Sequence, residues 1–572
     1  MSKRRELPAF NAGLLHVSDP SEPVLPAGEP SEAPEAPEGS LAVEESPDAA
    51  PAEDDDDLIE VERAPLPGDS RASRLWRAIW RTHFYSALIA TPVLIMLALT
   101  GLVILYTEPI QQFTSRDLTT VDVGSGDLVS LDEQLDAVTE EYPDLSFVAV
   151  TPPREADLAT RFTMSAESGT SYEVYVDPYT GEVQGRMKSG DDLVGLSNRL
   201  HGFFNNDTVT IPIPTVAGLF GPDPLFTDQP VGDLAIEVFA GWGLILALSG
   251  LYLWWPRKRG TGKALFVPRL GTPGRVRWRD LHAVGGTVLG VLLVFFVLTG
   301  LPWSAAWGTS WAWAASEITP NEKTSFWEWE GPASALPVTG DLDRDGNRIP
   351  WAAGQDEIPA SGGHDHHGGE EGSGSAGDVS VNTPTAEPVS LDVVAGAADE
   401  EGMLAGYTIN APYDVLDDPE APFYGSYVVF NPWPTRMADQ GALYLDQFSG
   451  ETLASSTAET WGELQWATEW GVQTHMGTQY GLVNRVLMTA GCVLLLWNIA
   501  TALVMWNKRR RKGTLGLPRR PVDLRIQRVL GITAVVLAVV FPLWGLSLVA
   551  VLLVDRYLIR RNKRLKAAFG QR

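Results

Sequence analysis

The sequence predicts a polytopic α-helical membrane protein with four core helices, a C-terminal hairpin or kinked helix, and two small α+β domains outside the membrane. Three observations predict this fold class: apolar runs long enough to cross a bilayer, basic residues that flank the runs unevenly, and two similar polar segments between the runs. The order of these features repeats once along the 572-residue chain. Because both copies run in the same direction, we expect a parallel internal repeat.

The apolar runs set the number of membrane crossings. A hydrocarbon core of about 30 Å requires roughly 20 apolar residues in a helix. Such runs occupy 84–107, 234–255, 283–303, 482–506 and 529–558. The last run has basic residues on both sides, so we expect a hairpin of two short helices that bends at Phe541 and Pro542. A single kinked helix remains an alternative, because the run is short for two complete crossings.

Basic flanks predict the orientation of the chain. Arg and Lys cluster before the first run, after the second, before the third and after the fourth. Under the positive-inside rule these flanks are cytoplasmic, so we expect a multi-pass protein of the cytoplasmic (inner) membrane with a cytoplasmic N-terminus. The segments 108–233 and 304–481 then lie outside. The lipid bilayer is one expected partner, and nothing in the sequence suggests nucleic-acid binding.

The first seventy residues differ in composition from the rest. They are rich in Pro, Asp and Glu and contribute much of the formal net charge of −29. Such a composition cannot offset the entropy cost of folding, so we expect a disordered acidic tail. The tail lacks an early apolar segment followed by a cleavage site, so the first membrane helix is expected to serve as an uncleaved targeting signal.

The two outer segments resemble each other. Each contains a helix-like stretch that begins with Ser-Leu-Asp, then strand-like runs that end in a hairpin signal of Asp, a short turn and Gly. We therefore expect two small α+β domains.

The expected boundaries are 1–70 for the tail, 71–107 for the first membrane helix, 108–200 for the first outer domain, 201–256 for an outer His segment and second helix, 278–303 for the third helix, 304–389 for an outer insertion, 390–460 for the second outer domain, 461–507 for a second His segment and fourth helix, and 525–560 for the C-terminal hairpin.

Two of the eight histidines begin equivalent membrane helices. His83 and His282 each precede the Gly of a Leu-Thr-Gly-Leu motif by 18 residues, at Gly101 and Gly300. Imidazoles are costly in lipid and usually face the interior of a helix bundle. Two of them at one depth on parallel helices suit bis-histidine ligation of a b-type haem. A helix-capping or interfacial role is the alternative for each His taken alone.

A second pair of histidines follows the outer domains. His201 in "RLHGFF" and His475 in "QTHMGT" each precede the returning helix. We expect them to hold a second haem near the outer face. Possible partners for the haem propionates are the arginines near the predicted pairs, Arg81, Arg279 and Arg485. The single cysteine, Cys492, excludes covalent haem attachment through C-x-x-C-H.

Other motifs carry weaker signals. His364, His366 and His367 could form a weak transition-metal site, although their Gly-rich surroundings make ordering costly. The G-x-G-x-x-G pattern at 372–377 has neither the preceding strand nor the following helix of a nucleotide site. No other nucleotide or flavin motif is recognisable, so electrons from the cytoplasm require a separate donor, which the sequence does not identify. We predict no catalytic acid or base.

The membrane segments carry a family resemblance. "RTHFYSALIATPVLIMLALTGLVILY", "GLYLWWPRK", "RDLHAVGGTVLGVLLVFFVLTGLPW" and the hairpin "YEVYVDPYTGEVQG" resemble the PepSY-associated transmembrane proteins, often called iron-regulated membrane proteins. The resemblance covers about 71–560, except the 315–390 insertion. It implies PepSY-like outer domains, and His83, His201, His282 and His475 match the family's histidine positions. Some members are reductases for ferric siderophores with two haems.

These observations predict a haem b electron carrier with two haems that reduces an external ferric chelate or siderophore for iron uptake. Whether the chain is such an enzyme, a ferric-chelate reductase, stays open at this point. One alternative is a PepSY module that binds proteins or regulates a protease without redox activity. Another is an accessory protein for metal handling that uses the His-rich loop.

Overall fold

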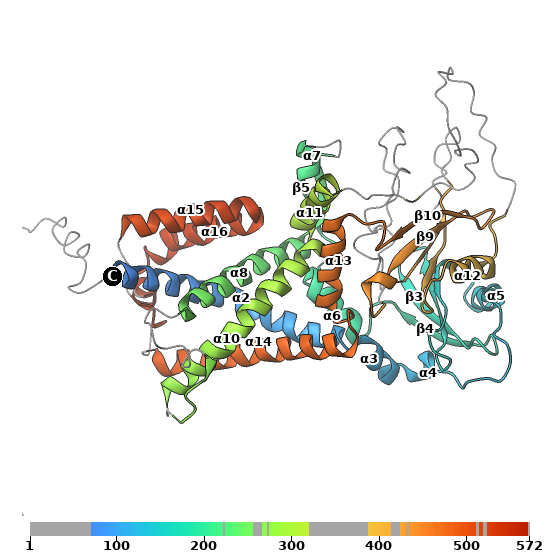
Figure 1. The fold of residues 1–572 in the computed structure, drawn as a ribbon, viewed down its shortest axis with the longest axis horizontal. Coiled ribbons are helices and arrows are strands. Elements are labelled where there is room, and N and C mark those ends of the chain that lie inside the picture. Colours follow the sequence, from blue (N-terminus) through green and yellow to red (C-terminus); the bar gives the residue numbers. More distant parts are fainter. Residues whose placement is uncertain are drawn as a thin grey trace, which may run out of the picture. The chain divides into compact units, whose positions relative to one another are not determined.

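The computed structural model describes most of the chain after residue 69. The described residues are 70–206, 208–220, 224–255, 266–271, 274–319, 358, 387–412, 414, 424–431, 434–510, 514–518 and 523–569. The predicted acidic tail and the histidines at 364, 366 and 367 lie outside these residues. Figure 1 shows two kinds of architecture in the described part, a bundle of long helices and an antiparallel sheet flanked by short helices.

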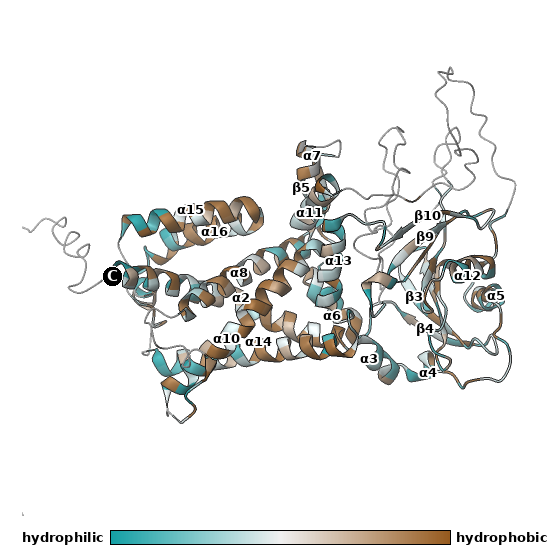
Figure 2. Ribbon diagram, viewed as in Figure 1, coloured by the Kyte–Doolittle hydropathy of each residue, from teal (hydrophilic) through white to brown (hydrophobic). Residues whose placement is uncertain are grey.

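Four long helices form the bundle. They are α2 (Arg71–Ile104), α8 (Val231–Trp254), α10 (Arg275–Gly300) and α14 (Leu482–Arg509). α2 packs mainly against α8, and α10 packs against both α8 and α14. Figure 2 shows apolar residues along most of the length of these helices. Within the described part of the chain, five segments are long and apolar enough to cross a membrane: these four and Pro542–Ile559. The prediction of a multi-pass helical membrane protein is confirmed at this level.

The C-terminal apolar run folds as a hairpin. Its arms are α15 (Leu524–Val540) and α16 (Pro542–Val554), and η5 (Asp555–Ile559) continues the second arm. Pro542 occupies the first turn of α16, where a missing N–H costs nothing. A Cβ added at Gly545 would lie 2.6 Å from Ala538 Cβ, so the arms meet closely at the bend. The first arm begins before the predicted run, at the residue after its N-cap Asp523, which gives the hairpin more length than hydropathy suggested.

A single eight-stranded antiparallel sheet contains strands from both predicted α+β segments. Its order is β10-β9-β8-β7-β1-β2-β3-β4. The strands of the first segment are β1 (Leu145–Thr151), β2 (Thr160–Ala166), β3 (Ser171–Val176) and β4 (Val183–Lys188). Those of the second are β7 (Thr408–Asn410), β8 (Tyr427–Phe430), β9 (Gly441–Leu445) and β10 (Thr452–Thr457). The two segments therefore share one continuous sheet instead of forming two separate ones.

The join between the two halves of the sheet is the β1–β7 pair. Val150 pairs with Ile409, both fully buried, and the hydroxyls of Thr151 and Thr408 lie 2.9 Å apart. β1 and β7 would each be an edge strand in an isolated half, and an edge strand leaves its backbone groups unpaired. Pairing the two edges removes this cost, which is why one sheet replaces two.

Two short helices cover one face of the sheet. α5 (Leu131–Glu141) and α12 (Leu391–Glu400) bury apolar residues such as Val138 and Val394 against strand residues such as Phe162. Their N-termini cap each other. Asp132 of α5 accepts hydrogen bonds from the backbone N–H groups of Leu391 and Asp392, and Asp392 accepts one from Leu131 N–H. Each carboxylate thus satisfies free N–H groups of the other helix.

The remaining elements lie before, between or after these helices and strands along the chain. They are α3 (Thr107–Thr114), α4 (Arg116–Thr119), α6 (Leu193–Phe203), β5 (Thr210–Pro214), α7 (Val216–Phe220), β6 (Phe226–Pro230), η1 (Leu301–Trp303), α11 (Ala305–Ile318), η4 (Met437–Asp439), α13 (Glu463–Met476) and α17 (Lys563–Ala568). Hydropathy did not predict α11. Its start is fixed by the buried Glu237 of α8, whose carboxylate accepts from the N–H groups of Ala306 and Trp307.

Candidate functional site

The structure brings His83 and His282 together inside the bundle. Their ring centroids lie 6.4 Å apart, with an angle of 71° between the ring planes. We call them the α2–α10 pair. His83 Nδ1 lies 3.1 Å from the carbonyl oxygen of Leu246, and His282 Nδ1 lies 3.2 Å from that of Asn498. Because a carbonyl oxygen can only accept, both Nδ1 atoms carry the proton.

His201 and His475 form a second pair. Their ring centroids lie 6.5 Å apart at an angle of 88°, and we call them the α6–α13 pair. His201 Nδ1 lies 2.9 Å from the hydroxyl of Thr100, and His475 Nδ1 lies 3.0 Å from that of Thr299. Each hydroxyl donates its own proton to a helix carbonyl, that of Met96 or of Phe295, so it accepts from the imidazole. All four Nδ1 atoms are therefore donors, and each Nε2 keeps its lone pair.

Glycines on the neighbouring helices give the rings room. A Cβ added at Gly250 would lie 3.1 Å from His83 Cε1, one at Gly101 would lie 3.4 Å from His201 Cε1, and one at Gly300 would lie 3.3 Å from His475 Cε1. Gly101 and Gly300 belong to the two Leu-Thr-Gly-Leu motifs. In each motif Thr orients a histidine and Gly lets its ring approach the helix.

Each sequence repeat builds one half of each pair. The first repeat contains His83, whose Nδ1 contacts the Leu246 carbonyl of α8. It also contains His201, whose Nδ1 contacts the Thr100 hydroxyl of α2. The second repeat contains His282, whose Nδ1 contacts the Asn498 carbonyl of α14. It also contains His475, whose Nδ1 contacts the Thr299 hydroxyl of α10. The two rings of each pair therefore come from equivalent positions of the two repeats.

The ring separation in both pairs is close to that of two imidazoles that bind one metal ion between them. A metal–imidazole bond of about 2.0 Å on each side, together with the distance from each nitrogen to its ring centre, adds up to about 6 Å. The observed separations of 6.4 and 6.5 Å match this sum. A metal-binding histidine commonly donates its second N–H to a neighbour, as all four do here. Ser86 Oγ, three residues beyond His83 on α2, and Asn498 Oδ1 are buried without a hydrogen-bond partner among the described residues, so a polar group bound here could satisfy them.

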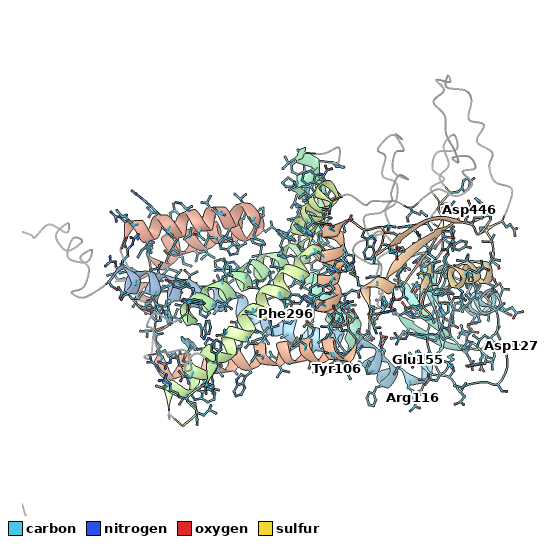
Figure 3. The ribbon with its side chains drawn as sticks, in the orientation of Figure 1. Tyr106, Arg116, Asp127, Glu155, Phe296 and Asp446 are labelled. Carbon is cyan, nitrogen blue, oxygen red and sulfur yellow. The ribbon has the colours of Figure 1, made fainter. Side chains whose placement is uncertain are left out.

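The two pairs lie far apart along the bundle. His282 and Gly300, which contacts His475, are 18 residues apart on α10, a rise of about 27 Å. The same spacing separates His83 from Gly101 on α2. Aliphatic side chains such as Leu289, Leu293 and Leu495 fill the core between the pairs. Phe296, labelled in Figure 3, packs edge-on against His475 with centroids 5.3 Å apart.

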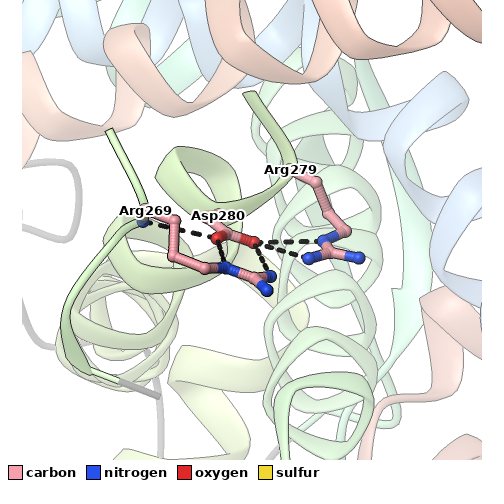
Figure 4. A network of polar contacts seen from close by, with 3 residues as sticks. All are labelled: Arg269, Arg279 and Asp280. Atoms are coloured by element: carbon pink, nitrogen blue, oxygen red, sulfur yellow. Dashed lines mark hydrogen bonds and ion pairs between the residues drawn. The ribbon is translucent and has the colours of Figure 1, made fainter. Parts of the chain in front are cut away.

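The three predicted propionate partners have different surroundings. Arg81 is buried and donates to the carbonyl of Pro518 and the hydroxyl of Tyr85. Arg279 binds the carboxylate of Asp280 at 2.8 Å, and Asp280 also binds Arg269, as Figure 4 shows. Arg485 lies over the ring of Tyr106 at 6.0 Å. Protein groups thus already engage Arg81 and Arg279.

Sequence reasoning missed the residues that orient the imidazoles. Thr100 and Thr299 were recognised only as marks of the repeat, although their equal distance from the two histidines was a signal for a role at the site. Ser249, whose hydroxyl lies 3.1 Å from His83 Nδ1, was also missed, together with its counterpart Thr501, whose hydroxyl lies 3.5 Å from His282 Nδ1. No group of three or more metal-ligating side chains occurs within the described ranges.

Several candidate membrane spans, an antiparallel sheet and two histidine pairs within one bundle define a multi-pass membrane protein with a repeated internal site. The family model described as the PepSY-associated TM region matches residues 80–509, more than half of the chain. The protein therefore belongs to this family, as its resemblance predicted, and the matched region contains all four paired histidines. A comparison with curated proteins finds no match.

Proposed function

We propose that the protein is a haem b electron carrier of the cytoplasmic membrane that reduces an external ferric chelate. The observation that supports it most directly is the arrangement of four imidazoles in two close pairs, in which every Nδ1 contacts an oxygen of a neighbouring helix and Nε2 is left as the nitrogen that could bind a metal. Capping or interfacial histidines would have no reason to meet in pairs at a distance that fits two metal–nitrogen bonds.

The protein's residues would hold, orient and insulate the two groups. His83 and His282 would bind one iron, and His201 and His475 the other. Haem supplies reversible one-electron chemistry when bound, and axial ligands and burial tune its potential. The hydrogen bonds to Nδ1 increase the basicity of each imidazole and fix the ring plane. The aliphatic core between the pairs excludes water from the path between them.

The separation of the pairs supports a role across the membrane. A rise of about 27 Å is close to the thickness of a hydrocarbon core. With the basic start of α2 in the cytoplasm, the α2–α10 pair lies near the inner face and the α6–α13 pair near the outer face. The sheet then lies outside, where it would shape the docking surface for the acceptor. A ferric siderophore is a suitable acceptor, because Fe(II) binds hard oxygen ligands less tightly than Fe(III).

Absorption spectroscopy of the purified full-length protein tests the first part of this proposal. We expect a Soret band, reduced α-bands and two haems per chain. His83→Ala and His282→Ala should each remove one haem and spare the other, whereas His201→Ala and His475→Ala should remove the second. Protein that stays colourless after expression in haem-replete cells would contradict the proposal and favour a PepSY interaction module without redox activity.

The acceptor is tested separately. Dithionite-reduced protein, freed of excess reductant, is mixed with ferric siderophores and simple ferric chelates, and haem reoxidation is followed by stopped-flow absorption. We expect faster reoxidation by at least one ferric chelate than by a matched gallium chelate, which has a similar shape but accepts no electron. Equal rates for both metals would contradict the reductase function while leaving the electron-carrier function intact.

A further inference from the structure

A cluster of one tryptophan and two arginines lies at the end of the bundle where α2 begins. The guanidinium carbon of Arg509, in the last turn of α14, lies 4.0 Å from the ring centroid of Trp80 on α2. Arg275, in the first turn of α10, lies close enough for its charge to repel that of Arg509. Neither arginine forms an ion pair with a carboxylate of the described residues.

The cluster faces the same side of the helices as the α2–α10 pair. Arg275 and His282 are seven residues apart, about two turns of α10, so they share a face about 10 Å apart. Arg509 is eleven residues, about three turns, beyond Asn498, whose carbonyl accepts from His282. Trp80 precedes His83 by three residues and is its neighbour on α2. Figure 1 shows the start of α10 beside the end of α14.

Arg275 is exposed and Arg509 is half-buried, so solvent weakens their mutual repulsion but does not remove it, and an anion bound between them would be attracted by both charges. Trp80 fixes one of them: the cation–π contact restricts the Arg509 side chain and covers part of it. The arginines nearer to the histidines in sequence are already engaged, Arg81 by Pro518 and Tyr85, and Arg279 by Asp280. Among the described residues, Arg275 and Arg509 are thus two arginines near this pair whose guanidinium groups form no ion pair with a carboxylate.

We infer that Arg275 and Arg509 form an anion site that binds the carboxylates at the edge of the haem held by His83 and His282. This inference rests on the proposed function. A lipid phosphate has the same charge and hydrogen-bonding capacity, and the test below separates the two sources. Two positive charges beside this group stabilise its reduced form, because reduction removes one positive charge from the iron. The site would thus raise the midpoint potential of one haem and leave the other, about 27 Å away along the helix, unaffected.

Potentiometric titration of the full-length protein in nanodiscs tests the site. Arg275→Gln and Arg509→Gln should each lower the midpoint potential of the haem that His83→Ala removes, and the double variant should lower it further. The potential of the other haem should not move. Arg509→Lys should restore part of the loss, since it keeps the charge. Arg277→Gln is the matched control, because Arg277 lies on the same helix turn over Trp278.

The outcomes are distinguishable. Wild-type protein without haem would refute the proposed function itself. Two haems with an unchanged potential in the double variant would overturn only this inference. Nanodiscs with and without phosphatidylglycerol separate the ligands: a potential shift of equal size in both supports the haem carboxylates, whereas a shift that requires the anionic lipid would assign the arginines to lipid headgroups and overturn the inference.

Discussion

At the scale of single residues, the threonine of each Leu-Thr-Gly-Leu motif determines which nitrogen of a neighbouring histidine carries the proton. Thr100 and Thr299 each accept the Nδ1 proton of one histidine, while their own hydroxyl protons are used by the preceding turn. This arrangement fixes the tautomer, so that Nε2 is the nitrogen whose lone pair could bind a metal. A motif that looks like an ordinary membrane-helix sequence therefore determines which nitrogen is available.

Replacing these threonines by valine should weaken the α6–α13 site. Valine has nearly the same shape but cannot accept the imidazole proton, so we expect Thr100→Val and Thr299→Val to lower haem affinity by about 10- to 100-fold at this pair. Titration of haem into the apo-protein, followed by absorption, measures the change. Thr533→Val is the control, because among the described residues the exposed Thr533 hydroxyl bonds only to the Val529 carbonyl of its own helix. Equal affinities in all three variants would contradict the assigned role.

The glycine beside His83 can be tested in the same way. Ala at position 250 would place a Cβ 3.1 Å from His83 Cε1, so the ring must move and its geometry toward His282 changes. We expect Gly250→Ala to reduce haem content at the α2–α10 pair although Ala favours helix formation by up to about 1 kcal/mol. Gly531→Ala, where no atom lies within 4 Å of the added Cβ, should leave haem content unchanged. A normal spectrum in Gly250→Ala would show that the ring has room to adjust.

At the scale of elements, the mutual capping of α5 and α12 links the two halves of the sheet domain. The Asp132 and Asp392 carboxylates face each other across the two helix N-termini. Partial burial and the neighbouring Asp132 carboxyl raise the pKa of Asp392 above its ordinary value of about 4, although the N–H of Leu131 opposes this. Protonation of Asp392 is thus easier in the folded protein than in the unfolded chain.

This pKa shift predicts a pH-dependent stability. A raised folded-state pKa contributes stability at low pH, which is lost as the pH rises through that pKa. Asp392→Asn, which mimics the protonated form, should therefore unfold at a higher temperature than wild type at neutral pH, and the difference should shrink toward a pH of about 4. Thermal unfolding of the full-length protein across this range measures it. Asp136→Asn, at an exposed position of α5, is the control, and a difference that grows toward acidic pH would refute the prediction.

At the scale of the whole molecule, the two sequence repeats are interleaved. Each histidine pair takes one ring from each repeat, the sheet joins the repeats through β1 and β7, and α8 of the first repeat packs against α10 of the second. Neither repeat alone contains a complete pair. Both candidate sites therefore depend on the association of the two halves of the chain.

Cleavage between the repeats tests this interdependence. A protease site inserted between α8 and α10 should yield two fragments that stay together, because the helix contacts and the strand pairing do not need the connecting peptide. Size-exclusion chromatography in mild detergent should show one peak that contains both fragments, and denaturing electrophoresis should separate them. Two separate peaks without denaturant would show that the two fragments do not associate and would contradict this prediction.

Much of the fold was predictable from the sequence for local reasons. Hydropathy over about 20 residues located the long helices, and the equal spacing from His83 to Gly101 and from His282 to Gly300 revealed the repeat. Hairpin signals located the strands but could not tell that β7 would pair with β1, since that choice depends on contacts between residues far apart in sequence. The choice between a hairpin and a kinked helix at Phe541 likewise required the packing of Ala538 against Gly545.

The sequence by itself determined that this protein crosses the membrane several times, that its two halves are related, and which four histidines are candidate ligands. These features follow from composition and spacing along one segment at a time. Only the tertiary structure decided which histidines meet, that every Nδ1 is already bonded, and which arginines have protein partners. The contacts of the histidines join residues at least 101 positions apart, such as Thr100 with His201 and His282 with Asn498. Such distances are set by helix packing and strand pairing, and no local pattern records them.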